Sequence, residues 1–307
     1  MNYDYAYGNQ FYNYYDNIGI KSVKYQIMAP EQSQAEQPGM EYLMTPRPIF
    51  DNPNYKGSGK LKDKVIIITG GDSGLGRAAA IAFVKEGAKV VIPYYNEHRD
   101  AEETKKYIEE LGGECLLLSG DITKKSFCKN IVKATIEKFG KIDILVNNAG
   151  VQYQQDRLES ISDEQFDWTM KVNIYGMFYL TREVLPYLKS GDSIINLSSV
   201  TTFYGEPQLI DYVTTKGAIV GFTRSLARSL ALKKIRVNAI APGVTTSDMT
   251  GFKSDENLYV SYNANERVYL PEEVAEVACF LLSDVSKCLS GQILVCNESK
   301  SVNAHWR

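Results

Sequence analysis

Short apolar runs alternate with amphipathic stretches along the chain from residue 64 to residue 296. The first run, KVIIIT (64–69), is rich in β-branched residues, which is typical of a parallel strand buried on both faces. After a glycine-rich turn, Leu75, Ala79, Ala82 and Phe83 share one face of a helix. Further apolar runs predict strands at 88–95, 115–119, 142–147, 193–198, 235–241 and 292–296. Helices are predicted between them at 98–111, 123–139, 162–188, 208–232 and 271–283.

Seven strands that alternate with helices predict an α/β fold, a doubly wound parallel sheet of the Rossmann type with right-handed crossovers. We expect one domain over residues 61–307 and an N-terminal arm over residues 1–60. The arm begins with a segment, 1–25, that holds seven of the 21 tyrosines and reads as a disordered leader. Residues 40–60 mix apolar side chains with prolines, so this part could instead lie across a neighbouring surface.

Composition excludes several classes of protein. Hydrophobic residues make up 44% and charged residues 23% of the chain, and the net charge is −3. Without a block of like charges, neither nucleic acid nor an anionic membrane is an expected partner. No apolar run approaches the ~18 residues of a membrane helix, and the N-terminus lacks the features of a signal peptide. Five scattered cysteines without a CxxC pair indicate free thiols in the cytoplasm.

Histidine is scarcer still, with only His98 and His305 in the chain. Neither residue has the context of a Ser–His–Asp hydrolase, and two histidines make a His-rich metal site improbable. We therefore expect no metal site.

The turn TGGDSGLG (69–76) joins the first strand to the first helix. Gly70, Gly74 and Gly76 allow a tight turn and a close approach of the backbone to a pyrophosphate, which the helix N-terminus attracts. The spacing is GxxxGxG and differs from the commoner GxGxxG. A purely structural turn is the alternative, but the position between a buried strand and an amphipathic helix favours nucleotide binding.

The chain resembles the short-chain dehydrogenase/reductase family over residues 61–297. The resemblance depends on motifs that occur in the family's order: TGGDSGLG (69–76), GDIT (120–123), NNAG (147–150), KVNIYG (171–176), INLSS (195–199), YVTTK (212–216) and APG (241–243). A branch of that family, often labelled general stress proteins or aldehyde reductases, also carries an arm with QPG (37–39), MTPRP (44–48) and GSGKL (57–61).

The resemblance implies a catalytic group of four residues. Tyr212 is the acid/base, Lys216 its partner, Ser199 the hydroxyl that binds the carbonyl, and Asn173 the fourth member. A lysine one helical turn away, together with the positively charged nicotinamide ring, is expected to lower the phenol pKa from its usual ~10. By spacing alone, Tyr212 and Lys216 could be two surface neighbours, and Asn173 could be a polar residue that bends its helix.

The resemblance also implies a set of cofactor contacts. Asp121 is expected to accept a hydrogen bond from the adenine, although it could instead cap the start of a helix. The expected contacts, with Lys216 serving both roles, are Gly70, Gly71, Asp72, Ser73, Gly74, Leu75, Gly76, Tyr94, Asn96, Asp121, Ile122, Asn148, Ala149, Gly150, Lys216, Pro242, Gly243, Val244 and Ser247.

The choice between NAD and NADP depends on the end of the second strand. Tyr94 aligns with the position where an acidic residue selects NAD, so the carboxylate that would repel NADP is missing there. Asn96, His98 and Arg99 follow closely and could contact a phosphate, whereas Asp72 in the glycine loop opposes NADP. We therefore expect weak discrimination, with both nucleotides used.

Two features depart from the family pattern. The seventh strand runs into CNESK (296–300), where the family usually has an NGG-like turn. The loop 244–270 is polar, carries Tyr259, Tyr262 and Tyr269, and is expected to form a mobile lid over the substrate.

The resulting prediction is an NAD(P)-dependent oxidoreductase that interconverts a carbonyl and an alcohol in a small aldehyde, ketone or sugar-like compound. The alternative is a catalytically silent nucleotide-binding protein with an assembly or sensing role. Helices 162–188 and 208–232 carry apolar residues on more than one face, which indicates a subunit interface. The family resemblance implies a homotetramer, with the arm at 38–60 reaching a neighbouring subunit.

Overall fold

The computed structural model describes residue 34, residues 36–250 and residues 269–297. The Tyr-rich segment 1–25, Tyr259, Tyr262 and His305, about which the sequence makes predictions, lie outside the described residues. In the described part of the chain, no helix is both long enough and apolar enough to cross a lipid bilayer.

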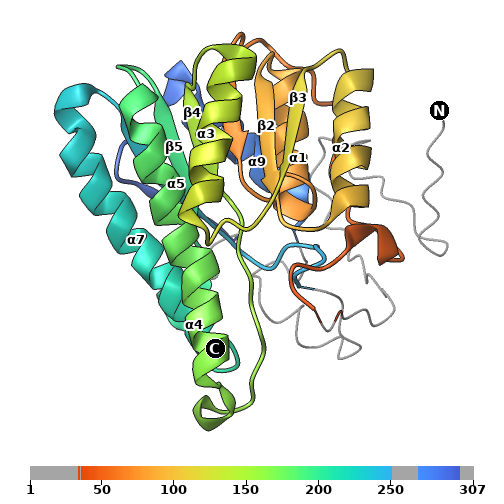
Figure 1. Cartoon of the computed structure of the whole chain (residues 1–307), viewed down its shortest axis with the longest axis vertical. Helices are drawn as coiled ribbons and strands as arrows, with labels where there is room; N and C mark the ends of the chain where they lie inside the picture. Colours follow the sequence, from red (N-terminus) through yellow and green to blue (C-terminus); the bar gives the residue numbers. More distant parts are fainter. Residues whose placement is uncertain (1–33, 35, 251–268, 298–307) are drawn as a thin grey trace, which may run out of the picture.

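Seven parallel strands form one sheet in the order β3-β2-β1-β4-β5-β6-β7 (Figure 1), which confirms the predicted doubly wound fold. The strand order reverses between β1 and β4, and ligands of such sheets bind beside this reversal at the carboxyl ends of the strands. The strands are β1 (Val65–Ile68), β2 (Lys89–Tyr94), β3 (Cys115–Ser119), β4 (Ile144–Asn147), β5 (Ser193–Leu197), β6 (Arg236–Pro242) and β7 (Ile293–Cys296).

Helices cover both faces of the sheet (Figure 1). Side chains of a strand alternate between its faces, and β1 shows this directly. Ile66 and Ile68 belong to the hydrophobic core under α1 and α9, whereas Ile67 belongs to the core under α3, α5 and α7. The helices are α1 (Gly74–Lys85), α2 (His98–Glu110), α3 (Lys125–Phe139), α4 (Asp163–Met170), α5 (Met177–Val184), α6 (Thr201–Tyr204), α7 (Ile210–Leu230) and α9 (Pro271–Leu282).

The segment predicted as one helix over 162–188 is interrupted in the structure. α4 passes into a π-helical segment, η3 (Lys171–Gly176), before α5 begins, and the segment ends in a 3₁₀ turn over Leu185–Tyr187. A π-helical turn inserts an extra residue, which the spacing of apolar positions does not reveal. The interruption contains Asn173, so a predicted catalytic residue lies where the helix is irregular.

The described part of the arm, residues 36–60, packs against its own chain. Met44 is buried, and Phe50 packs against the core beneath α1 and makes an edge-on contact with Tyr107 of α2. Glu41, in a short 3₁₀ helix η1 (Glu41–Leu43), is fully buried. The sequence also predicts that the arm reaches a neighbouring subunit, and this contact stays a prediction.

The arm joins the catalytic part of the chain at the buried carboxylate of Glu86. Its Oε2 accepts hydrogen bonds from the backbone N–H groups of Ser58 and Lys60, each at 2.9 Å, and Oε1 accepts from Lys60 Nζ at 2.8 Å and from the Tyr55 hydroxyl. These donors outweigh the effect of burial and lower the pKa of Glu86 from 4.5 to about 2.

We expect Glu86→Ala to lower the free energy of unfolding by about 2–4 kcal/mol, because it leaves the backbone N–H groups of Ser58 and Lys60 without their acceptor. Urea denaturation at pH 7 measures this loss, and Glu137→Ala on the exposed side of α3 is the matched control. The pKa of Glu86 is lowered in the folded state, so its stabilisation is present above pH 4.5 and is lost as the pH falls toward about 2. An equal loss of stability in both variants would contradict the anchoring role.

Candidate active site

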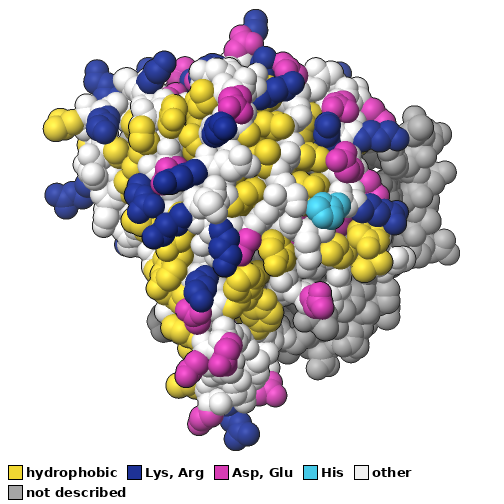
Figure 2. Space-filling model, in the orientation of Figure 1, with side chains coloured by type: hydrophobic (Ala, Val, Ile, Leu, Met, Phe, Trp, Pro, Cys, Tyr) yellow, Lys and Arg dark blue, Asp and Glu magenta, His cyan; other side chains and the backbone are white. Residues whose placement is uncertain are grey.

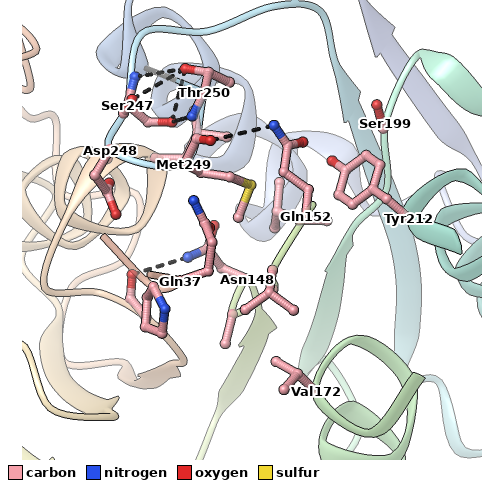
Figure 3. Close-up of a pocket in the computed structure, with 18 of the residues that line it drawn as sticks. Gln37, Asn148, Gln152, Val172, Ser199, Tyr212, Ser247, Asp248, Met249 and Thr250 are labelled. Carbon is pink, nitrogen blue, oxygen red and sulfur yellow. Dashed lines mark hydrogen bonds between the residues drawn. The ribbon is translucent and has the colours of Figure 1, made fainter. Parts of the chain in front are cut away.

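A cavity lies outside the carboxyl ends of the parallel strands and follows the glycine loop. Tyr94 and Asp121 line one end, and Tyr212 and Ser199 line the other. Figure 3 shows Tyr212 and Ser199 on one side of this cavity, with Ser247 and Asp248 across from them. The predicted contacts that line it are Gly70, Asp72, Ser73, Gly74, Leu75, Tyr94, Asp121, Ile122, Asn148, Ala149, Gly150, Lys216, Pro242, Gly243, Val244 and Ser247.

Three predicted contacts, Gly71, Gly76 and Asn96, are not among the lining residues. The two glycines serve close packing instead. A Cβ on Gly76 would lie 1.9 Å from the Gly70 carbonyl oxygen, and one on Gly71 would lie 3.0 Å from the side chains of Ile68 and Ile92. Gly70 has the left-handed φ of +63° that the turn itself requires.

Thr69 and Asn148 tie the glycine loop to the end of β4. The Thr69 hydroxyl accepts hydrogen bonds from the backbone N–H groups of Asn148 and Ala149, each at 3.0 Å. Asn148 Nδ2 donates in return to the carbonyl oxygens of Thr69 at 2.9 Å and Gly70 at 3.1 Å. The loop is therefore fixed with backbone facing the cavity, which fits an extended dinucleotide crossing the strand ends.

The guanidinium of Arg77 supports the loop from within the protein. Nε donates to the Asp72 carbonyl oxygen at 2.9 Å, and Nη2 donates to the Asp100 carbonyl oxygen at 2.9 Å. Nη1 pairs with Glu41 Oε1 at 2.5 Å, while Glu41 Oε2 accepts from the Gly74 N–H at 2.7 Å. A residue of the arm therefore binds the first residue of α1. Glu41 and Gly74 are 33 residues apart in the sequence, and no sequence pattern predicted their contact.

The structure brings Tyr212, Lys216 and Ser199 together. Tyr212 and Lys216 lie near the start of α7, and the Lys216 Nζ is 5.3 Å from the centre of the Tyr212 ring. Lys216 Nζ donates to the Leu197 carbonyl oxygen at 2.8 Å, which fixes the ammonium beneath β5. Ser199 follows β5, and its side chain lies near enough to the Tyr212 hydroxyl to favour a lower pKa of that phenol.

Asn173 lies behind this group and does not line the main cavity. Its Oδ1 accepts from the Val151 N–H at 2.8 Å, and its Nδ2 donates to the Val151 carbonyl oxygen and to the Thr215 hydroxyl, each at 3.0 Å. A Cβ on Gly150 would approach Asn173 Oδ1 at 3.2 Å and Lys216 Nζ at 3.5 Å. Asn173 therefore supports the strand end beside Lys216.

Burial controls the protonation of the catalytic pair. It raises the pKa of Tyr212 to about 12, with the hydrogen bond from Ser199 opposing the rise, and it lowers the pKa of Lys216 to about 8. In the chain itself burial therefore dominates, and the lowering predicted with the nicotinamide bound stays a prediction. Tyr212 is consequently a proton donor at neutral pH.

Asp121 combines both interpretations of its motif. Its Oδ1 accepts from the Thr123 N–H at 2.8 Å, two residues before α3 begins, so the carboxylate caps a local turn. The residue nevertheless lines the cavity.

The cations proposed to bind a phosphate are engaged elsewhere. His98 Nδ1 lies 3.0 Å from the Tyr94 hydroxyl, and Arg99 pairs with Glu103 and lies over the ring of Tyr42 at 4.4 Å. Neither residue is among those that line the cavity.

Several lining residues were missed by the sequence analysis. Glu97 comes from the β2–α2 loop, Gln37 and Pro38 come from the arm, and Gln152 follows the NNAG motif. For Glu97 the available signal was a carboxylate three residues after the aligned position, Tyr94. The part of the expected lid at 244–250 lines the cavity, whereas residues 251–268 lie outside the described residues.

Comparisons with known proteins agree with the motifs. A family model described as enoyl-(acyl carrier protein) reductase matches residues 70–298. The chain is 50% identical to the uncharacterized oxidoreductase YhxC of Bacillus subtilis, across 89% of this chain and 96% of the relative. It is 39% identical to the NADPH-dependent aldehyde reductase 1, chloroplastic, of Arabidopsis thaliana, across 91% of this chain and all of the relative.

A solved structure is similar as well. The 3-ketoacyl-(acyl-carrier-protein) reductase of Brucella melitensis, complexed with NADH, superposes with a TM-score of 0.74 at 34% identity. It covers 78% of this chain and 99% of that protein. The chain belongs to the short-chain dehydrogenase/reductase family of NAD(P)-dependent oxidoreductases.

Proposed function

We propose that the protein interconverts the carbonyl and alcohol forms of a small aldehyde, ketone or sugar-like compound, with Tyr212, Ser199, Lys216 and Asn173 as its catalytic group. The observation that carries this proposal is the buried Tyr212 phenol beside Ser199, at one end of a cavity that follows the glycine loop. The arm over residues 1–60 and a catalytic domain from residue 61 are part of the same proposal.

The nicotinamide, when bound, supplies the hydride for reduction or accepts it in oxidation. As negative charge develops on the substrate oxygen, Tyr212 donates its proton and Ser199 donates a hydrogen bond to the same atom. Lys216 holds a positive charge beneath the phenol through its hydrogen bond to the Leu197 carbonyl oxygen. Asn173 positions the Gly150–Val151 backbone next to that ammonium.

The cofactor contacts keep the roles that their motifs imply. Ser73, Gly74 and Leu75 line the cavity at the N-terminus of α1, where a pyrophosphate is favoured, although the Gly74 N–H itself is bonded to Glu41. At one end of the cavity Asp121 and Ile122 would contact the adenine, and Pro242, Gly243 and Val244 would lie beside the nicotinamide.

The substrate end of the cavity combines polar groups with apolar side chains such as Val151, Val200 and Leu209. Near Tyr212 it is lined by the amide side chains of Gln152 and Gln208, by Glu206, and by the aromatic ring of Trp168. Amide and carboxylate groups hydrogen-bond hydroxyls, so this lining suits a small polar carbonyl compound or polyol. The similarity to an aldehyde reductase supports the same class.

We further propose a cytoplasmic homotetramer. Phe166, Tyr175 and Phe178 on α4, η3 and α5 are each exposed by more than 40%. Phe178 also contacts Phe222 of α7, with ring centres 6.5 Å apart. Figure 2 shows hydrophobic side chains exposed among lysines and arginines on this face. Aromatic groups of this kind favour burial between subunits.

Tyr212→Phe removes the proton donor and keeps the ring. We expect turnover to fall by about 10²-fold or more while the nucleotide still binds. Steady-state reduction of an aldehyde panel and a fluorescence titration with NADH and NADPH measure the two effects. Tyr187→Phe, at an exposed position outside the cavity, is the control. Near-normal turnover of Tyr212→Phe would refute the assigned mechanism.

The pH profile of reduction follows from the two pKa values. Lys216, with a pKa of about 8, loses its proton before Tyr212, with a pKa of about 12. We expect kcat/KM for carbonyl reduction to be constant between about pH 6 and 7 and to decrease above about pH 8, as the ammonium is lost. A profile that stays flat to about pH 10 would exclude a role for that charge.

A tetramer has a mass of about four times 34.4 kDa, and multi-angle light scattering at micromolar concentration measures it. Phe178→Glu places a charge on the proposed interface and is expected to reduce the mass. Leu111→Glu, at a position of the same 43% exposure after α2, is the matched control. A monomeric mass for the unmodified protein would contradict the proposal.

A further inference from the structure

Glu97 is a buried carboxylate at the end of β2. It precedes α2, is 2% exposed, and folds back on the chain so that Oε2 accepts from the Tyr95 N–H at 3.1 Å and the Asn96 N–H at 2.9 Å. The two backbone N–H groups thus fix Oε2, and neither of them bonds the other carboxylate oxygen, Oε1. A carboxylate that the backbone holds in this way is already oriented before a ligand arrives.

The same side chain lines the cofactor cavity, together with Tyr94 and Asp72. Asp72 is also buried, and after burial itself the nearby charge of Glu97 is the largest cause that raises the pKa of Asp72. The two carboxyl groups therefore lie close together at this end of the cavity. The sequence predicted that the NAD-selecting carboxylate is missing at position 94.

No cation balances them within the lining. Among the described residues that line the cavity, Lys216 is the sole lysine or arginine, and it belongs to the catalytic end. Arg77 is directed at Glu41 and Asp100, and Arg99 at Glu103. A dianionic phosphate at this end would meet two carboxyl groups and no lysine or arginine of the described lining, since Arg77 and His98 act on these carboxyls from outside it.

We propose that Glu97 replaces, in space, the acidic residue missing at position 94: it accepts a hydrogen bond from the ribose 2′-hydroxyl of NAD(H) and disfavours the 2′-phosphate of NADP(H). The inference rests on the proposed function and adds the cofactor preference to it. Family membership leaves this choice open, since one relative is described as NADPH-dependent and one similar structure holds NADH. The sequence alone predicted that both nucleotides are used.

Binding of two adenosine fragments tests the inference without depending on turnover. Adenosine 5′-monophosphate has a free 2′-hydroxyl, and adenosine 2′,5′-bisphosphate carries the phosphate in its place. By isothermal titration, we expect the unmodified protein to bind the monophosphate at least about 10-fold more tightly. Glu97→Gln, which removes the charge and keeps the size, should reduce that ratio to within about 3-fold.

Glu110→Gln is the matched control, because it makes the same change at the exposed end of α2 and should leave the ratio unaltered. The ratio of kcat/KM for NADH and NADPH should shift in the same direction as fragment binding. Equal or tighter binding of the bisphosphate by the unmodified protein overturns the inference, whether or not the variant folds. An unchanged ratio in folded Glu97→Gln overturns it too. Failure of the unmodified protein to bind either fragment, NADH or NADPH would instead refute nucleotide binding itself.

Discussion

The part of the structure around the glycine loop depends on the hydrogen bonds of the buried Arg77 guanidinium. A buried charge must be paired and hydrogen-bonded, and loss of one partner leaves it uncompensated. Arg77 meets this requirement with partners from three separate segments: the Asp72 carbonyl oxygen in the glycine loop, Glu41 in the arm, and Asp100 in α2. The relative positions of these segments are therefore coupled through a single side chain.

One consequence is that the arm participates in the nucleotide site of its own chain. Glu41 accepts the hydrogen bond of the Gly74 N–H, an otherwise unpaired donor at the start of α1, and a carboxylate is favoured there by the helix dipole. Gln37 and Pro38, a few residues earlier, line the cavity. The glycine loop is thus held by Thr69 and Asn148 from the sheet and by Glu41 and Arg77 from the arm side.

The fold and the catalytic group were predictable because their signals are local. Consecutive β-branched residues predict a strand such as β1, and a spacing of four predicts that Tyr212 and Lys216 share a helix face. The π-helical turn at Asn173 and the contact of Glu41 with Gly74 left no such signal, since each arises from packing between distant segments. The role of Glu97 left no such signal either, since its side chain folds back on the backbone of Tyr95 and Asn96, which sequence position alone does not show.

The two ends of the cavity are therefore specified by different parts of the chain. Chemistry at the catalytic end depends on β5 and α7, whose motifs carry the family resemblance, and burial there keeps Tyr212 protonated as a donor. Selection at the other end depends on Glu97 of the β2–α2 loop and Asp72 of the glycine loop, whose carboxyl groups line the cavity there. Because these parts make separate contacts, substitutions in the loop can change the cofactor while the reaction stays the same. Membership in the family consequently predicts the reaction, whereas the cofactor must be derived from the charges that line this particular cavity.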